Sequence, residues 1–263
     1  MISERASQQA FFGTSALLFA TSATLTVVWC ASMSAMEKMP MPGDWAMSMA
    51  WMRMPGQTWP GAAASFLTMW VVMMMAMMLP SLAPMLWRYR QAVDWPGESR
   101  LARLTALVGL GYFLVWTSCG LALFPLGVAL AAVEMQFQLL ARAVPIAGGV
   151  VVLIAGAVQF TPWKAHHLAC CREAPGHGCA LPADADTAWR QGVHFGLHCG
   201  LSCANLTAIL LVIGVMDIRA MAVVTAAITL ERLAPAGERV ARAIGVVIVG
   251  TGLLLIARAA RLG

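Results

Sequence analysis

Charged residues are scarce in this 263-residue sequence, at 11% of the chain, whereas 60% of it is hydrophobic and the mean hydropathy is +0.76. An ordinary soluble domain carries roughly 25% charged residues. Charges this sparse, separated by long apolar runs, exclude that class and predict a membrane protein. We therefore expect an all-α fold, a polytopic transmembrane helical bundle in a lipid bilayer, with residues 1–263 forming one domain of 6–7 spans.

Several signatures of enzymes and of nucleic-acid-binding proteins are also missing. There is no hydrolase triad, phosphate-binding loop, long internal repeat or low-complexity tract. The net charge of +5 is modest, and arginines in loops that orient a membrane protein account for it. These absences predict a protein that is not an enzyme and has no nucleic-acid partner, although thiol redox activity stays open.

Apolar stretches define the predicted spans, and the first five of these stretches contain no charged residue. They lie at about 10–34, 62–79, 104–133, 143–163, 191–216, 219–233 and 238–259. Pro80 and Pro84 are expected to end the second span, because proline removes a helical hydrogen bond. The sixth is doubtful as a span, since about 15 residues cover only about 22 Å of a hydrocarbon core about 30 Å thick.

Lysine and arginine are distributed unevenly between the two sides of the predicted bundle. With alternating spans, eleven lie on one side and six on the other. Cytoplasmic loops of membrane proteins are enriched in these residues, so the richer side is expected to face the cytoplasm. That places residues 164–190, a predicted Cys/His-rich loop, in the cytoplasm, and residues 33–59, a Met-rich loop, outside.

Methionines are concentrated in two neighbouring stretches. The outer loop holds eight of them: Met33, Met36, Met39, Met41, Met47, Met49, Met52 and Met54. In the next helix, Met69, Met73 and Met77 recur every four residues and share one face. Thioethers prefer monovalent copper, so this face is a candidate metal path. The alternatives are an interfacial loop with apolar contacts and a polarizable packing stripe.

The strongest chemical signal is the stretch 166–203. It contains all five histidines of the chain (His166, His167, His177, His194 and His198) and five of the seven cysteines (Cys170, Cys171, Cys179, Cys199 and Cys203). The cytoplasm keeps thiols reduced, so these cysteines are better interpreted as ligands or redox thiols than as structural disulfides. The candidate metal ligands are His167, Cys170, Cys171, His194, His198, Cys199 and Cys203, with His177 and Cys179 in supporting roles.

Helical geometry limits how these ligands combine. His194 and His198 are four residues apart and share a face, but Cys199 and Cys203 point away from His194. One interpretation joins these cysteines to Cys170/Cys171 and a histidine from the preceding loop, and we prefer it. The other breaks the helix at Gly196 and Gly200, a pair that also suits close helix packing.

Several short motifs resemble one bacterial family. The residues that carry the resemblance are Met74–Pro80, Gln159-x-Thr161-Pro162-x-Lys164, Cys171-Arg172, Gly196-Leu197-x-Cys199, Gly214-x-Met216 and Glu231-Arg232-x-x-Pro235-x-Gly237. The chain is similar to predicted metal-binding integral membrane proteins, a domain family of unknown function. It departs from that pattern at His167, Ser202 and Ala204, where the family has two cysteines and a tryptophan. The resemblance implies metal binding in the bacterial inner (cytoplasmic) membrane by a multi-pass protein.

Mixed thiolate and imidazole donors suit zinc, Cu(I) or an iron–sulfur cluster, and the methionines favour Cu(I) over Zn. The sequence therefore predicts a soft transition metal bound for transport, buffering or delivery, with a metallochaperone or metalloenzyme as partner. A membrane thiol oxidoreductase and a structural assembly partner of a metalloenzyme are the alternatives. Glu231 and Arg232 are expected to form an interfacial ion pair outside the metal site.

Overall fold

The computed structural model describes residues 2–34, 39–41, 45–47, 51, 53, 56–94, 97–172 and 181–262. It is helical apart from one short hairpin, which confirms the predicted fold class. The helices are α1 (Ile2–Ser34), α2 (Trp59–Ala92), α3 (Glu98–Gln136), α4 (Gln138–Val158), α5 (Pro162–Arg172), α6 (Ala185–Ile213), α7 (Ile218–Leu233) and α8 (Gly237–Leu262). Strands β1 (Met39–Met41) and β2 (Trp45–Met47) pair antiparallel after α1.

Six helices of the described chain, α1, α2, α3, α4, α6 and α8, are long and apolar enough to cross a membrane. This confirms the polytopic bundle, at the lower end of the predicted range of 6–7 spans. The doubtful segment 219–233 belongs to α7, whose 16 residues extend about 24 Å. That length falls short of a hydrocarbon core about 30 Å thick.

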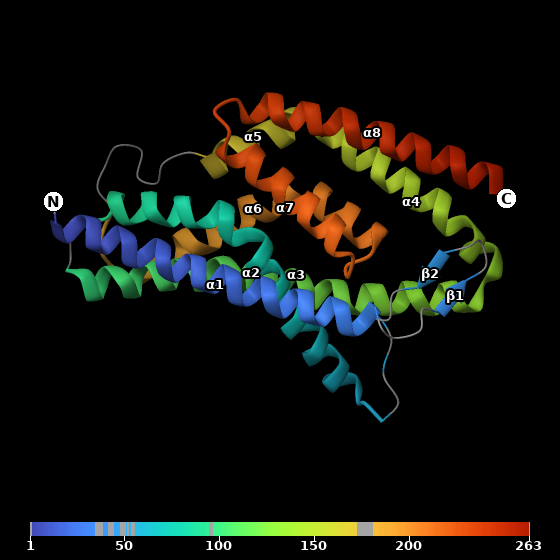
Figure 1. Ribbon diagram of the computed structural model, residues 1–263, viewed down its shortest axis with the longest axis horizontal. Helices are drawn as coiled ribbons and strands as arrows, with labels where there is room; N and C mark the ends of the chain where they lie inside the picture. The colour runs from blue at the N-terminus through green and yellow to red at the C-terminus, as the bar shows by residue number, and fades with distance from the viewer. Residues whose placement is uncertain are drawn as a thin grey trace.

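The bundle has two distinct ends (Figure 1). The start of α1 and the turn between α2 and α3 lie at one end, called here the amino-terminal end, and β1 and β2 lie towards the opposite end. α4 and α8 are antiparallel partners, since Gly149 lies against Ile256 and Gly156 against Val249. α7 brings the chain from the end of α6 back to α5, so the two termini lie at opposite ends.

The prolines of the second span do not end it, contrary to the prediction. α2 continues through Pro80 and Pro84 to Ala92. Leu82 and Tyr89, beyond the first proline, are fully buried, so tertiary packing stabilises the helix past the lost hydrogen bonds. Membrane helices tolerate proline where neighbouring helices satisfy the freed backbone groups.

The predicted loop of residues 164–190 is helical at both ends. α5 carries the first part of this stretch, and α6 starts several residues before its predicted position. Pro162 begins α5, where its missing N–H costs nothing. Asp184 caps α6 by accepting a hydrogen bond from the Thr187 N–H (2.8 Å). Only residues 173–184 separate the two helices, and α5 packs against α6.

The Asp184 cap is expected to be sensitive to acid. Hydrogen bonds from the backbone N–H and the hydroxyl of Thr187 hold the pKa of Asp184 below its usual value of 3.8. The ionised cap therefore stabilises the folded protein above about pH 4, and this contribution is lost as the pH falls through the lowered pKa. We expect the wild type to melt at a higher temperature than Asp184→Ala at neutral pH, and the difference to shrink towards about pH 3.

Thermal unfolding in detergent micelles across this pH range measures the effect. Asp184→Asn is the control, because asparagine also caps helices but does not titrate. A difference between wild type and Asp184→Ala that stays constant with pH would contradict the assignment.

Close packing of α3 and α6 depends on two glycines of α6, Gly192 and Gly196. This pair lies one helical turn before the predicted pair, Gly196 and Gly200. A Cβ at Gly192 would overlap the backbone oxygen of Val108, and one at Gly196 would lie 2.9 Å from that of Tyr112. A Cβ at Gly200 would meet nothing within 4 Å, so the predicted Gly196–Gly200 packing pair is wrong in register. α6 is also continuous through these glycines, and the alternative of a helix break is wrong.

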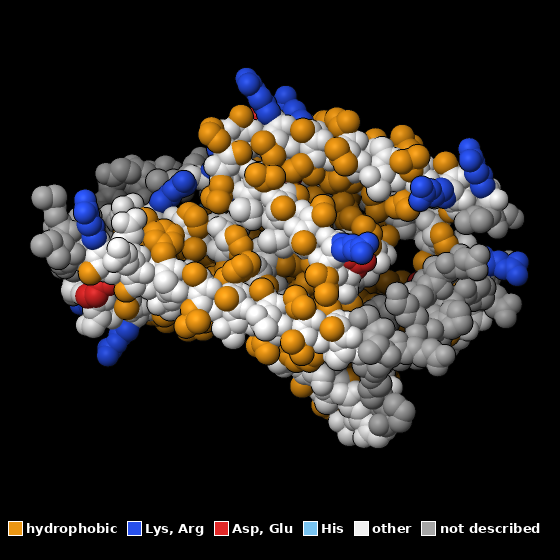
Figure 2. All heavy atoms as spheres, viewed as in Figure 1, with side chains coloured by type: hydrophobic (Ala, Val, Ile, Leu, Met, Phe, Trp, Pro, Cys, Tyr) orange, Lys and Arg blue, Asp and Glu red, His pale blue; other side chains and the backbone are white. Residues whose placement is uncertain are grey.

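Apolar side chains cover much of the face shown in Figure 2, and charged side chains are few. On the outer faces of α3, α4 and α8, residues such as Leu121, Ile154 and Leu254 are exposed. Trp163 and Trp189 are partly exposed near the Cys/His stretch, as tryptophan often is at a membrane–water interface. This surface suits a lipid bilayer rather than water.

Candidate metal centre

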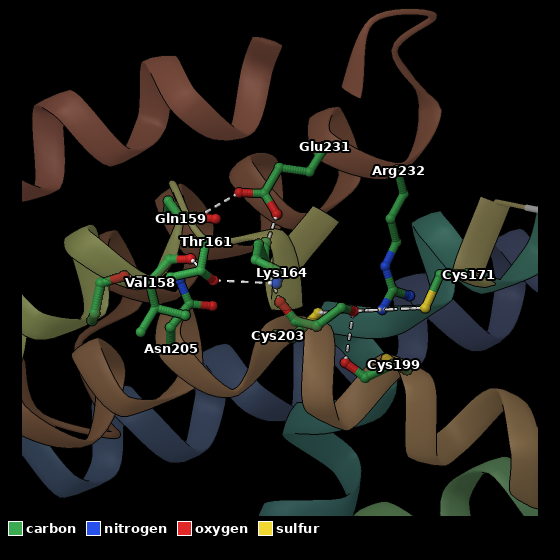
Figure 3. A network of polar contacts seen from close by, with 12 residues as sticks. Val158, Gln159, Thr161, Lys164, Cys171, Cys199, Cys203, Asn205, Glu231 and Arg232 are labelled. Atoms are coloured by element: carbon green, nitrogen blue, oxygen red, sulfur yellow. Dashed lines mark hydrogen bonds and ion pairs between the residues drawn. The ribbon is translucent and has the colours of Figure 1, made fainter. Parts of the chain in front are cut away.

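Three thiols lie together inside the bundle (Figure 3). Cys171 comes from α5, Cys199 and Cys203 come from α6, and all three are buried. Cys199 and Cys203 are four residues apart, which places them on one helical face. α5 lies across that face, so Cys171 reaches the same region; these three residues are called the thiol cluster below.

Two side chains from other helices reach Cys199. The Sδ of Met78, from α2, lies 3.9 Å from the Cys199 Sγ, and the Tyr112 hydroxyl, from α3, lies 2.8 Å from it. Sulfurs that share a metal at about 2.3 Å each stand roughly 3.8 to 4.6 Å apart. The Met78–Cys199 pair is therefore already at the spacing of two ligands of one ion.

A guanidinium group lies against the thiol cluster. Nη2 of Arg232, from α7, is 3.2 Å from the Cys203 Sγ and 3.2 Å from the Ser202 Oγ, and Nη1 is 3.2 Å from the Ser81 Oγ. Arg232 is buried, and within the described chain its side-chain partners are hydroxyls and thiols, with no carboxylate among them. A buried cation requires a compensating anion. Thiolate is the anion that this surrounding can supply.

A second buried network lies beside the first. Lys164 Nζ is 2.8 Å from Glu231 Oε2 and donates to the backbone oxygen of Ser202, and Gln159 Nε2 donates to Glu231 Oε1 (2.7 Å). The predicted interfacial Glu231–Arg232 pair is wrong: both residues are buried, and the partner of Glu231 is Lys164. Adjacent side chains on a helix diverge by about 100°, which separates the two roles.

The histidines form a separate group at the α5–α6 contact, called the histidine cluster below. His167 Nδ1 and His198 Nδ1 are 3.2 Å apart, and the His194 and His198 rings are 4.3 Å apart between centroids. His166 Nε2 lies 3.8 Å from the Cys170 Sγ. Nitrogens that share a metal at about 2.0 Å stand roughly 3.3 Å apart, so the His167–His198 pair also has ligand spacing.

Burial shifts the pKa in opposite directions in the two clusters, lowering it for a histidine and raising it for a thiol. Desolvation, followed by the neighbouring His166, lowers the pKa of His167, so its ring is neutral and able to bind a metal at pH 7. Burial raises the pKa of the Cys171 thiol, and the Arg232 guanidinium opposes part of that shift. Burial thus favours the protonated form of the Cys171 thiol.

Comparison with known proteins identifies the family. A family model described as a copper chaperone matches residues 67–255. The chain belongs to the copper chaperone family. No curated protein and no solved structure matches it. The region shared with the copper chaperone family contains the thiol cluster, Met78 and Arg232, and it leaves out α1.

The seven candidate ligands of this copper chaperone family member divide between the two groups. Cys171, Cys199 and Cys203 lie in the thiol cluster. His167, His194 and His198 lie in the histidine cluster, and Cys170 contacts His166 there. The preferred interpretation of the sequence joins both Cys170 and Cys171 to the cysteines of α6, whereas the structure brings only Cys171 to them. His177 and Cys179 lie outside the described residues.

No group of three or more His, Cys, Asp or Glu side chains in the described part of the chain has the geometry to hold a metal ion. Within the thiol and histidine clusters, the pairs at ligand spacing include the Cys199 thiol with the Met78 thioether and the His167 imidazole with the His198 imidazole. No disulfide joins the six cysteines that the structure describes, so the thiol cluster keeps its sulfur donors. Any metal site here therefore includes methionine, or closes by a small movement of α5.

Several site residues are not evident from the sequence alone. The sequence predicts an interfacial ion pair for Arg232 and no role in metal binding for Lys164 or Met78. The signal is nevertheless present, because motifs that carry the family resemblance converge here: Gln159 and Lys164, Cys171, Cys199, and Glu231 with Arg232. The separate motifs do not reveal that these residues lie together in the folded protein.

The three methionines of the predicted metal path form no hydrogen bond with the thiol cluster within the described part of the chain. Met73 and Met77 are buried in the core and Met69 is partly buried. The thioether that reaches a thiol belongs to Met78, the neighbour of Met77. The face of α2 turned towards α6 is therefore one position away from the predicted face.

Proposed function

We propose that this protein binds Cu(I) at the thiol cluster and delivers it, as a membrane-embedded copper chaperone. One observation carries the proposal: thiols from α5 and α6 and a thioether from α2 converge beside a buried guanidinium. That convergence lies within the region that matches the copper chaperone family. Soft sulfur donors suit Cu(I) better than harder divalent ions.

The charge of Arg232 supports monovalent copper over zinc. Cu(I) held by the thiolates of Cys199 and Cys203, with Cys171 still protonated, carries a net charge of −1, which the guanidinium 3.2 Å from Cys203 neutralises. Zn(II) held by the same two thiolates is neutral and would leave Arg232 uncompensated in a buried place. Uncompensated buried charge costs several kcal/mol, roughly 3–5 when one partner of a pair is removed.

The histidine cluster is the proposed exit from the thiol cluster. His198 precedes Cys199 in the chain and its ring is partly exposed, whereas the Cys199 thiol is fully buried. An ion that leaves the thiols therefore meets the imidazoles of this cluster next. The excess of lysine and arginine on this side supports its placement in the cytoplasm, where a metallochaperone or metalloenzyme would accept the copper.

Metal binding by the purified protein tests the proposal. We expect the double variant Cys199→Ser/Cys203→Ser to lose roughly 100-fold or more in Cu(I) affinity, since loss of a residue that only supports a ligand already costs 10–100-fold. The measurement is anaerobic competition with a chromophoric Cu(I) chelator in detergent, with X-ray absorption to show sulfur coordination. Cys119→Ser, a thiol on α3 outside the cluster, is the matched control.

Three outcomes would reject the proposal or its delivery role. Equal Cu(I) affinity in wild type and the double variant would remove the thiol cluster as the site. Loss of titratable thiols in the resting, metal-free protein would favour a thiol oxidoreductase. Accumulation of copper inside proteoliposomes without an acceptor protein would favour transport over delivery.

A further inference from the structure

A second group of sulfur atoms lies towards the opposite end of the bundle. Cys30 is near the end of α1, Met69 and Met73 are on α2, and Met216 follows α6. With Thr26 and Trp29 they line a void of about 180 Å³ of empty space that is too narrow for a water molecule. None of these lining side chains is charged.

The spacing of the sulfurs fits a shared soft ion. The Cys30 Sγ is 3.8 Å from the Met216 Sδ, and two ligands at about 2.3 Å from one metal stand roughly 3.8 to 4.6 Å apart. Met69 and Met73 are one helical turn apart on α2 and line the same void. Four sulfur atoms from three separate segments of the chain thus surround one small space.

Two of the four sulfur-containing residues are more exposed than the other two. Cys30 and Met73 are buried, whereas Met69 and Met216 are only partly buried. A hydrated ion cannot enter a void that excludes water, so an ion would exchange its water for thioethers at the outer pair. The buried pair would then complete its coordination.

We propose that Cys30, Met69, Met73 and Met216 form a second Cu(I) site, which receives the ion at the opposite end and passes it along α2 to Met78. One thiolate and three thioethers give a neutral Cu(I) complex, which suits a lining without charged side chains. Met73 and Met78 are five positions apart, about 7.5 Å along the helix, with Met74 and Met77 buried between them. This site rests on the proposed function for the identity of the ion but uses none of its residues.

A site with one anionic donor holds copper less tightly than a site with two or three. The proposed order of sites therefore runs from weaker to stronger binding along α2, ending at the thiol cluster. Cys30 lies outside the region that matches the copper chaperone family, and the three methionines lie inside it. Contact between α1 and α2 thus brings the Cys30 thiol to three methionines that lie within the matched region.

Copper stoichiometry tests the second site. The wild type is expected to bind about two Cu(I) per chain in anaerobic titration, and the variant Cys30→Ser/Met216→Leu about one. Replacement of methionine by leucine conserves side-chain volume, so Met216→Leu is expected to fold. This single variant replaces the double variant in the test if the double variant fails to fold. The matched controls are Cys119→Ser and Met135→Leu, which remove a thiol and a thioether of α3 outside this group.

The outcomes separate the two proposals. If Cys30→Ser/Met216→Leu and Met216→Leu bind copper as the wild type does, the second site is rejected and the thiol cluster stands. If Cys199→Ser/Cys203→Ser keeps both ions while Cys30→Ser/Met216→Leu loses one, the second site stands and the proposed function fails. Loss of one ion in each double variant, and of both when the two are combined, supports the two sites together.

Discussion

Replacement of Glu231 by glutamine is expected to lower the free energy of unfolding by about 3–5 kcal/mol. The reason is that Lys164 would then be a buried charge without a partner. Both side chains of this ion pair are almost fully buried, and Nζ and Oε2 are 2.8 Å apart. The introduced amide would still accept a hydrogen bond from Gln159 but would carry no charge to offset the ammonium group.

A double-mutant cycle measures this effect. Lys164→Met and Glu231→Leu should each be strongly destabilising, whereas the combination Lys164→Met/Glu231→Leu should cost less than either alone, because no unpaired charge remains. The exposed pair Arg190–Asp186, 3.8 Å apart and with both side chains 79% exposed, is the control. Asp186→Asn should change the free energy of unfolding by less than about 1 kcal/mol.

Denaturant unfolding in mixed micelles provides the free energies. If Glu231→Gln proved no more costly than Asp186→Asn, the buried ion pair would not be a structural element of the fold. If the double variant were the least stable of the three, direct packing rather than charge compensation would explain the losses.

Replacement of Gly192 by alanine is expected to destabilise the bundle by about 3 kcal/mol, at the upper end of the usual range for overpacking. The added Cβ would overlap the Val108 backbone oxygen, and a backbone atom cannot rotate away as a side chain can. α3 and α6 would have to separate. That movement would also shift Tyr112 from Cys199, whose contact is 2.8 Å.

Gly200→Ala is the matched control for this variant. It lies two turns along the same helix, and its Cβ would meet nothing within 4 Å. Alanine is favoured over glycine in a helix by roughly 0.5–1 kcal/mol, so this variant should be neutral or stabilising. Thermal unfolding of both variants tests the comparison; equal effects would mean that α3 and α6 are not in close contact at Gly192.

The two sulfur groups and the buried ion pair together suggest how the bundle handles a cation. The group around Cys30 lacks a charged lining residue among the described side chains, and the thiol cluster has Arg232 beside it. Lys164 also contacts Ser202 beside the thiol cluster but is paired with Glu231, so Arg232 is the cation near the thiols that has no carboxylate partner among the described residues. A copper ion is therefore expected to stop at the thiols until an acceptor removes it, which suits delivery better than free passage.

The fold class and the types of donor atom could be predicted from the amino-acid sequence. Scarce charge and long apolar runs require helices in a bilayer, because only helices and closed barrels satisfy their backbone groups there. The same scarcity made ten histidines and cysteines within 166–203 stand out. The family resemblance also followed from local motifs, and the copper chaperone match supports its metal-related part.

Which donor atoms meet depends on how the helices pack. Cys170 and Cys171 are neighbours in sequence, yet Cys171 joins the thiols and Cys170 faces His166, because adjacent helical side chains diverge by about 100°. Pro80 did not end its helix, since burial of the residues beyond it outweighs the lost hydrogen bond. Arg232 reached the thiols only because α7 folds back across α5 and α6. Contacts of this kind join residues far apart in the chain, so they depend on packing rather than on local sequence.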